Sequence, residues 1–313
     1  MKQKYNIIGD THGRTAWKDL VISDGINIFV GDYFSPYVKM SFEDQLNNFL
    51  EIINYKIEHP ETILLIGNHD DQHWKNISMK TSRFDYYNWK RIQEVFNEFS
   101  DFMQVTYNID NRVLVSHAGV SVAWYVNQLL HTSTNILYRL DKEEDCHTIE
   151  EAVESFKKEA ISVLPEIELD DGVIFEWKNN FYYIKEDKPY IVNTDLETIS
   201  TFVNNIWNSE NVKCFNFSEN ATTFSDGYGT SPTHGPMWIR PSTLKDYNIF
   251  KGKELFQVVG HTMFKQVSQV DNIFYVDCLQ YAKESLIVTI NEKEITFQRN
   301  NGEEKVNSND TSA

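Results

Sequence analysis

The sequence predicts a mixed α/β protein, and three observations lead to this prediction. Short apolar runs that suit buried strands alternate along the chain with amphipathic stretches that suit helices. Five of the apolar runs end directly in a short loop that carries Asp, Asn or His, as strands of helix-connected sheets do where they bind ligands. The 313 residues, 41% of them hydrophobic, are enough to bury a sizeable core.

The first elements are two strands and a helix. Tyr5–Ile8 ends in the loop GDTHG, and Ile26–Val30 ends in GDY. Apolar residues at helical spacing then run from Phe42 to Ile57, and this predicts a helix. Ser41 is its expected N-cap, because its hydroxyl can accept a hydrogen bond from the first turn.

Three further strands and one helix follow the same logic. Thr62–Ile66 leads into GNHDD, Arg112–Ser116 leads into HAG, and Leu255–Val259 leads into GHT. Residues Phe84–Phe99 have the apolar spacing of a helix. Loops from strands that are far apart in the sequence are therefore expected to converge on one place.

The stretch between the last two of these strands is longer than a compact connection requires, and we expect residues 125–235 to form an inserted α+β cap on a domain spanning 1–299. Within it Glu150–Leu164 and Thr198–Trp207 have helical spacing, and Tyr190–Val192 suits a strand. The polar tail 300–313 is expected to be disordered.

The net charge of −17 disfavours binding to nucleic acid, because an acidic surface repels a polyanion. No apolar run approaches the roughly 18 residues of a membrane span. The three cysteines, Cys146, Cys214 and Cys278, lie far apart without metal-site spacing. These features together favour a reduced, cytoplasmic protein.

The loop residues have the chemistry of a metal site. Asp10 and His12 are one residue apart, so both side chains can point to one side of an extended segment. Asp32 can bridge two cations with its two oxygens. Oxygen and imidazole ligands without cysteine suit Mn, Fe, Zn or a similar first-row ion.

Asn68, His117 and His261 would complete a two-cation site, which can activate a water and bind phosphate oxygens. His69, next to a ligand, would then protonate the leaving oxygen as a general acid. Each residue alone has an ordinary structural explanation, such as a turn aspartate or a core histidine. Five coincidences in this order favour the functional interpretation. Two other histidines, His73 and His234, lie near these segments and have no assigned role.

The order GDTHG, GDY, GNHD, SHAG and GHT resembles the calcineurin-like metallophosphoesterases, and looks closest to the branch of phosphoprotein phosphatases and symmetrical dinucleoside tetraphosphatases. The resemblance implies a four-layer αββα sandwich of two sheets flanked by helices. It implies one metal held by Asp10, His12 and Asp32, and a second held by Asp32, Asn68, His117 and His261. His69 matches the catalytic histidine, and Asp70 matches the acidic residue that closes the third motif and is grouped with the catalytic residues.

The segment Trp238-Ile239-Arg240-Pro241 resembles one that is common in bacterial relatives just before the last metal histidine. Arg240 is therefore the expected phosphate-binding residue, since a guanidinium can contact two oxygens at once. A structural salt bridge is the alternative for Arg240. Asp277 matches a family aspartate after the following strand, and we expect a structural role for it.

The second motif departs from the family. The usual form is GDxxDRG, in which the later Asp orients the catalytic histidine and the Arg binds phosphate. Ser35 and Pro36 stand at these two positions here. The metal ligands are unaffected by this change. Either another residue supplies the two roles, or the enzyme is slow, or the substrate differs, and the assignment as a protein phosphatase is weakened.

We therefore predict a metallophosphoesterase with two divalent ions, manganese being expected and iron, zinc or nickel being alternatives. It would hydrolyse a phosphate ester or anhydride by direct attack of metal-bound hydroxide. A phosphoprotein or a dinucleoside polyphosphate is the expected substrate, with a nucleotide third. The alternative is a non-catalytic binding module that retains a metal site on the same fold, and the altered second motif favours this alternative somewhat.

Overall fold

The computed structural model describes residues 2–75, 82–131, 137–138, 172–177, 180–185, 188–208, 230–292 and 294–302. Within these ranges the chain forms a mixed α/β fold with two central sheets, and the predicted fold class is confirmed. The predicted helix Glu150–Leu164 and the end of the polar tail lie outside the described residues. No helix in the described ranges has the length and apolar character to cross a membrane.

Six strands form the first sheet, in the spatial order β15 (Ile295–Asn300), β14 (Ser285–Ile290), β1 (Gln3–Ile8), β2 (Ile26–Phe29), β3 (Ile63–Leu65) and β4 (Met103–Gln104). The strands β1 to β4 are parallel to one another, whereas β14 is antiparallel to β1. The carboxyl ends of β1, β2 and β3 therefore lie at the same edge of this sheet.

Five strands form the second sheet, in the order β12 (Ser268–Val270), β13 (Ile273–Tyr275), β11 (Phe256–Val259), β6 (Val113–Ser116) and β5 (Thr106–Ile109). Its central strands β13, β11 and β6 are parallel. The loops that follow β6 and β11 therefore leave the sheet at one edge, like the loops of the first sheet.

The two sheets pack face to face through alternate residues of their strands. Ile7, Ile28 and Leu65 of the first sheet share one apolar cluster with Val115 and Val258 of the second. The alternate positions, among them Ile8, Phe29 and Leu64, point instead into a second cluster that contains helical residues. Strands that are buried on both faces read as continuous apolar runs, which is why the sequence shows no polar alternation here.

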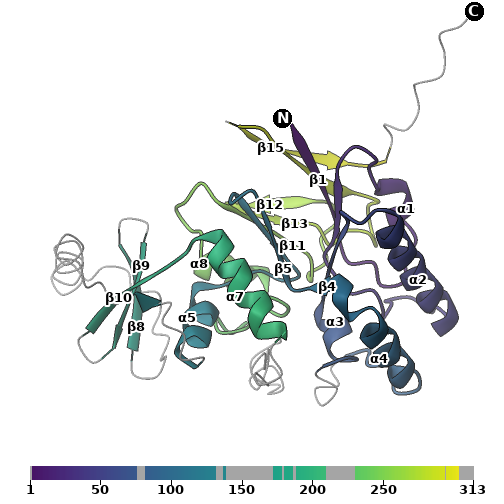
Figure 1. Ribbon diagram of the computed structural model, residues 1–313, viewed down its shortest axis with the longest axis horizontal. Helices are drawn as coiled ribbons and strands as arrows, with labels where there is room; N and C mark the ends of the chain where they lie inside the picture. Colours follow the sequence, from purple (N-terminus) through teal and green to yellow (C-terminus); the bar gives the residue numbers. More distant parts are fainter. Residues whose placement is uncertain are drawn as a thin grey trace, which may run out of the picture.

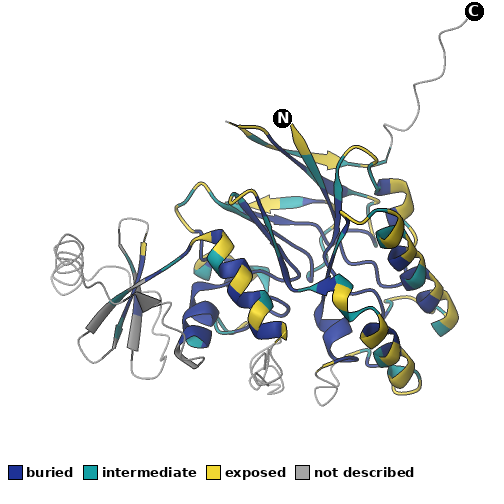
Figure 2. Cartoon of the chain, viewed as in Figure 1, coloured by how far each residue is buried: buried dark blue, intermediate teal, exposed yellow. Residues whose placement is uncertain are grey.

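Helices cover the outer faces, so that the fold has four layers (Figure 1). The first sheet is flanked by the helices α1 (Trp17–Leu20), α2 (Phe42–Glu58) and α4 (Trp89–Glu98), the last followed by the short 3-10 helix η1 (Ser100–Phe102). The inner strands are buried, while the outer faces of α2 and α4 are exposed (Figure 2). As predicted, the Ser41 hydroxyl accepts a hydrogen bond from the backbone N–H of Asp44 at 3.1 Å and caps α2.

The second sheet carries its own helices, α5 (Val122–His131), α7 (Leu196–Asn208) and α8 (Pro241–Tyr247). Helix α7 packs against β5, and the Asn204 side-chain oxygen accepts from the backbone N–H of Val105 at 2.9 Å. Leu244 of α8 shares an apolar cluster with Val259 and Tyr275. Although α7 falls inside the expected insertion, it thus belongs to the packing of the main sheets.

A separate four-stranded sheet comes from the same stretch of sequence. Its spatial order is β7 (Leu137–Tyr138), β10 (Lys188–Val192), β9 (Asn180–Lys185) and β8 (Gly172–Trp177), all antiparallel. It lies at the far left of Figure 1, beyond α5. Residues of this expected cap thus build a meander of their own beside the two main sheets.

One helix is shorter than the sequence predicts. The prediction Phe84–Phe99 places its start five residues too early, because α4 begins at Trp89. The Asp85 carboxylate accepts hydrogen bonds from the backbone N–H groups of Tyr87 and Asn88, and these bonds hold a turn in place of a first helical turn. Phe84 instead stacks on His73.

Gly31 allows two loops to touch at the carboxyl edge of the first sheet. Its φ is +102°, and an added Cβ would lie 2.3 Å from the backbone nitrogen of Gly67. We therefore expect Gly31→Ala to lower the free energy of unfolding by about 3 kcal/mol or more, since strain and overlap add. Urea unfolding measures this change. Gly302→Ala is the matched control, because Gly302 also has a positive φ of +77° but its nearest atom would lie 3.0 Å away. Equal losses in the two variants would contradict the packing argument.

Candidate metal centre

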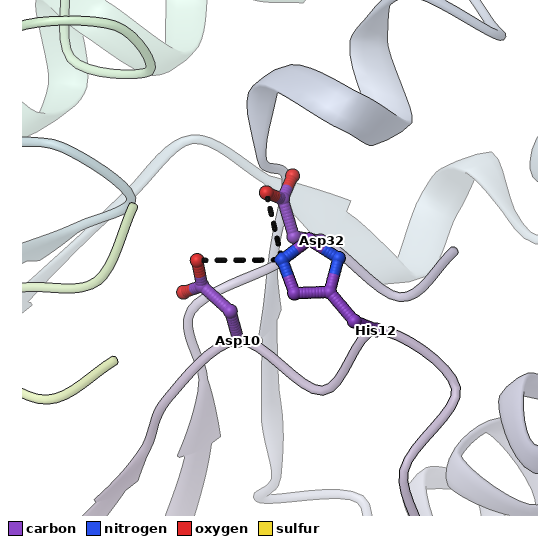
Figure 3. A group of neighbouring side chains, drawn as sticks. All are labelled: Asp10, His12 and Asp32. Atoms are coloured by element: carbon purple, nitrogen blue, oxygen red, sulfur yellow. Dashed lines mark ion pairs between the residues drawn. The ribbon is translucent and has the colours of Figure 1, made fainter. Parts of the chain in front are cut away.

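The first group of site residues lies in the loops that follow β1 and β2. One ligand atom each from Asp10, His12 and Asp32 lie within 4.8 Å of one another, and all three residues are buried. The His12 Nε2 atom lies 3.6 Å from Asp32 Oδ2 and 4.0 Å from Asp10 Oδ2 (Figure 3). These separations exceed a hydrogen bond and suit groups that face a common point between them.

The second group joins three distant segments. Asn68 is the first residue of the short helix α3 (Asn68–Asp71) that follows β3, while His117 follows β6 and His261 follows β11. The Asn68 Oδ1 atom lies 3.0 Å from His117 Nε2 and 2.8 Å from His261 Nδ1. All three side chains are buried.

Asp32 and His117 connect the two groups. The Asp32 Oδ2 atom that faces His12 also lies 3.5 Å from His117 Nε2. His117 Nδ1 lies 3.8 Å from Asp10 Oδ1 on its other side. All six residues that the sequence proposes as ligands are therefore brought together, with Asp32 between the two groups.

Each of the three imidazoles is fixed through one ring nitrogen by a backbone carbonyl. The bonds are His12 Nδ1 to Phe34 O at 2.8 Å, His117 Nδ1 to Val30 O at 2.8 Å and His261 Nε2 to Trp238 O at 3.0 Å. A carbonyl oxygen only accepts, so these nitrogens carry the proton. In the neutral rings the opposite nitrogens are then lone-pair donors directed at the carboxylates and at Asn68, as in metal-bound histidines.

The residues fit divalent cations. In the described part of the chain His12 Nε2 is buried without a hydrogen-bond partner. The Asn68 oxygen and the unprotonated nitrogens of His117 and His261 also direct lone pairs at one another, with no proton among them. A cation between such groups would satisfy all of these lone pairs.

Burial favours the neutral forms of these groups, and a cation would reverse that effect for the carboxylates and reinforce it for the imidazoles. Desolvation raises the pKa of Asp32 to about 7 and lowers the pKa of His117 to about 3. Desolvation, followed by the charges of Asp277 and Asp32, raises the pKa of Asp10 well above its ordinary value. A divalent ion stabilises ionised carboxylates and neutral imidazoles, so it supplies the charge that this cluster lacks.

Several site residues hold a backbone conformation that is unfavourable for non-glycine residues. His12, Asp32 and His261 have φ values of 45°, 54° and 63°. Such conformations persist where the surroundings over-determine them, and they concentrate at functional sites. The backbone N–H of His12 donates to Asp32 O at 2.7 Å, and that of His261 donates to Asp10 Oδ2 at 3.0 Å. The ligand-bearing loops thus hold one another.

Asp70 joins two of these loops through backbone hydrogen bonds. Its buried carboxylate accepts from the N–H groups of Asp32 at 2.6 Å, Tyr33 at 2.8 Å and Gly67 at 3.0 Å. The carboxylate therefore fixes the loop of the second motif against the start of α3. The sequence grouped Asp70 with the catalytic residues, and its contacts are those of a positioning residue.

His69 lies beside the cluster and is oriented by a residue that the sequence analysis missed. Its backbone N–H donates to Asp32 Oδ1 at 2.8 Å. Its Nδ1 lies 2.9 Å from Gln72 Nε2, and its Nε2 lies 2.6 Å from Arg83 Nη2. Gln72 thus orients this imidazole, which is the role of the Asp that the second motif lacks. Desolvation and then the charge of Arg83 lower the pKa of His69 well below its ordinary value.

Arg83 is the second residue that sequence reasoning missed. No motif surrounds it, and the only signal was the absence of Asp and Arg from the second motif. His73, to which the sequence assigns no role, helps to hold the segment of Arg83. Its Nδ1 donates to His69 O at 2.7 Å and its Nε2 accepts from Asp85 N at 2.9 Å. His73 therefore ties the segment of Arg83 to the segment of His69.

The remaining expected residues lie around the same centre. The Arg240 guanidinium donates to Thr262 Oγ1 at 3.0 Å and to His261 O at 3.4 Å, in the loop of the last metal histidine. Asp277 is buried, and desolvation followed by the charge of Asp32 raises its pKa to about 7. His234 is buried in the segment before Trp238, and we assign it no role.

Comparison with known proteins gives this site its family. Residues 4–164, just over half of the chain, match the family described as Calcineurin-like phosphoesterase. The chain belongs to this family. The matched range contains all the site residues described above except those from His234 onward. No curated protein matches the chain.

A solved structure offers one further likeness. It is a serine/threonine phosphatase from Saccharomyces cerevisiae with similarity to human phosphatase PP5, at 15% identity and a TM-score of 0.42. The likeness covers 95% of this chain and 79% of that one.

The family match, together with the Asp10, His12 and Asp32 cluster, makes the chain a metal-dependent calcineurin-like phosphoesterase that hydrolyses phosphate esters.

We expect Asp70→Asn to destabilise the protein. The amide keeps the shape of the carboxylate, but its NH2 has to face one of the buried backbone N–H donors. The expected loss in the free energy of unfolding is about 2 kcal/mol. Urea unfolding measures it, with Asp101→Asn as the control because Asp101 is exposed. A loss no larger than that of the control would contradict the conclusion that Asp70 holds the loop of the second motif against α3.

Proposed function

We propose that this phosphoesterase uses two divalent metal ions, most simply manganese, with iron, zinc and nickel as alternatives. Asp10, His12 and Asp32 would hold one ion, and Asp32, Asn68, His117 and His261 would hold the other. The observation that carries the proposal is the convergence of lone pairs from the three anchored imidazoles, the Asn68 oxygen and the Asp32 oxygen between them. Bound ions would polarise the phosphoryl oxygens and lower the pKa of the attacking water.

The remaining steps belong to residues of the chain. His69 lies beside Asp32 and would contact the leaving oxygen and donate a proton to it. Gln72 would keep the imidazole oriented without adding charge, and Asp70 would keep the His69 segment against the second motif. Arg240 would bind a phosphoryl oxygen from the side of His261. Since water is the nucleophile, no residue becomes phosphorylated.

The substrate would be a phosphate ester or anhydride. Phosphoproteins and dinucleoside polyphosphates are the first candidates, followed by nucleotides. The net charge of −17 is unfavourable for nucleic acid, and a local cluster of cations is compatible with a small or peptide-borne phosphate. A panel of these compounds, assayed with manganese, would rank them.

We expect Asp10→Asn to remove metal binding and activity together. A neutral amide cannot supply the carboxylate charge, and the amide NH2 would oppose the backbone N–H of His261 that donates to Asp10. Manganese stoichiometry and manganese-dependent turnover of para-nitrophenyl phosphate are the measurements, and activity should fall at least about a hundredfold. Asp101→Asn serves as the control. Full metal content with full activity in Asp10→Asn would refute the assigned ligand, and absence of turnover in the unmodified protein would favour a binding module.

We expect His69→Asn to affect substrates according to their leaving group. Turnover of an alkyl phosphate should fall by about 10²- to 10⁴-fold, because an alkoxide needs a proton, and turnover of an activated aryl phosphate should fall less. The measurement is the ratio of kcat for the two substrates in variant and wild type. His59→Asn is the control, since His59 lies on the surface beside Glu61. An equal loss on both substrates would argue against the general-acid role.

A further inference from the structure

An arginine outside every motif presents its side chain to the candidate active site. Arg83 Nη2 donates to His69 Nε2 at 2.6 Å, and its Nη1 donates to the backbone oxygen of Ser35 at 2.7 Å. The guanidinium carbon lies 3.6 Å from the centre of the Tyr37 ring. Tyr37 in turn makes an edge contact with the imidazole of His12. Arg83 therefore lies between the catalytic histidine and the altered second motif.

Several hydrogen bonds fix the position of Arg83. Ser35 and Arg83 both have left-handed backbones, with φ values of 63° and 62°. They exchange hydrogen bonds, since the Ser35 hydroxyl donates to Arg83 O at 3.2 Å while the guanidinium donates to Ser35 O. His73 also holds this segment, because its Nε2 accepts a hydrogen bond from the backbone N–H of Asp85. Two strained residues joined in this way keep the guanidinium in place.

The charge of Arg83 is not neutralised locally. Within the described ranges no carboxylate lies within ion-pair distance of its guanidinium, although the side chain is half-buried. Its charge lies at the candidate active site, because the guanidinium contacts the imidazole of His69. Two of its five N–H donors are engaged by described partners. A half-buried cation with donors to spare is suited to an anion that has several oxygens.

We propose that Arg83 binds a phosphoryl oxygen of the substrate, and that it does so in place of the arginine absent at Pro36. The inference rests on the proposed function and adds a binding residue to it. Arg83 approaches from the side of His69, whereas Arg240 approaches from the side of His261. A phosphoryl group bound between the two arginines would accept the hydrogen bond that the Arg83 guanidinium otherwise donates to His69 Nε2. That nitrogen, which carries no proton while it accepts from Arg83, would then take up a proton from solvent and pass it to the leaving oxygen.

A purely structural role is the competing explanation, because Arg83 also holds the loop of Ser35. The two explanations differ in what is lost when the guanidinium is removed. A structural arginine supports the loop, and its loss would affect metal content and thermal stability. A phosphate-binding arginine affects the affinity for phosphate itself.

The test measures binding of inorganic phosphate to the full-length, manganese-loaded protein by calorimetry. Arg83→Ala removes the side chain, and Arg83→Met keeps an apolar stem over Tyr37 without the charge. We expect both variants to bind phosphate at least about tenfold more weakly and to raise KM by a similar factor, with manganese stoichiometry unchanged. Arg91→Ala is the matched control, because Arg91 is exposed on α4 and pairs with Glu94.

Phosphate affinity within twofold of wild type in an Arg83 variant that retains its manganese would overturn the proposal. If Arg83→Ala does not fold, Arg83→Met decides by the same criterion. Wild-type protein that shows no phosphate binding would overturn it as well. A wild type that binds phosphate through Arg83 but hydrolyses no ester would count against the proposed function alone, and it would support the binding role of Arg83.

Discussion

The site is organised by the burial of carboxylates and imidazole lone pairs in one small volume without a compensating positive charge among them. Asp10 and Asp32 are almost fully inaccessible, and burial raises the pKa of both carboxyls. The anchored imidazoles meanwhile present unprotonated nitrogens to the same volume. A protein interior tolerates such a cluster when cations neutralise it. Metal dependence therefore follows from electrostatics as well as from family membership.

The rest of the architecture holds this cluster together. The parallel strands of two sheets bring their carboxyl ends to one edge, and each strand contributes one short loop. The loops then fasten one another through backbone contacts, such as the bonds that Asp70 accepts and the close approach of Gly31 to Gly67. Because His12, Asp32 and His261 sit in left-handed conformations, these contacts have to outweigh local strain. Packing energy from the four layers thus maintains the geometry of the site.

The second motif differs from the family pattern at positions expected to contact the substrate and the catalytic histidine, and not at the proposed metal ligand. Every proposed metal ligand keeps its place, although Ser35 and Pro36 replace the expected Asp and Arg. Gln72 orients His69, and a guanidinium from outside the motif reaches the same histidine. A metal cluster constrains its ligands strongly, whereas a phosphate can be approached by an arginine from more than one segment. Such a site can change the second motif while its proposed metal ligands stay in place.

The sequence by itself determined the alternation of strands and helices, the main element boundaries and the loops that hold Asp10, Asp32, Asn68, His117 and His261. It could do so because apolar runs followed by Gly and a polar residue are local signals. Tertiary structure alone decided the packing of α7 against β5 and the contacts of Gln72 and Arg83 with His69. Arg83 reaches His69 because a left-handed turn and hydrogen bonds to Ser35 bring distant segments together. Contacts of that kind depend on where folded segments meet, and no local pattern of residues encodes them.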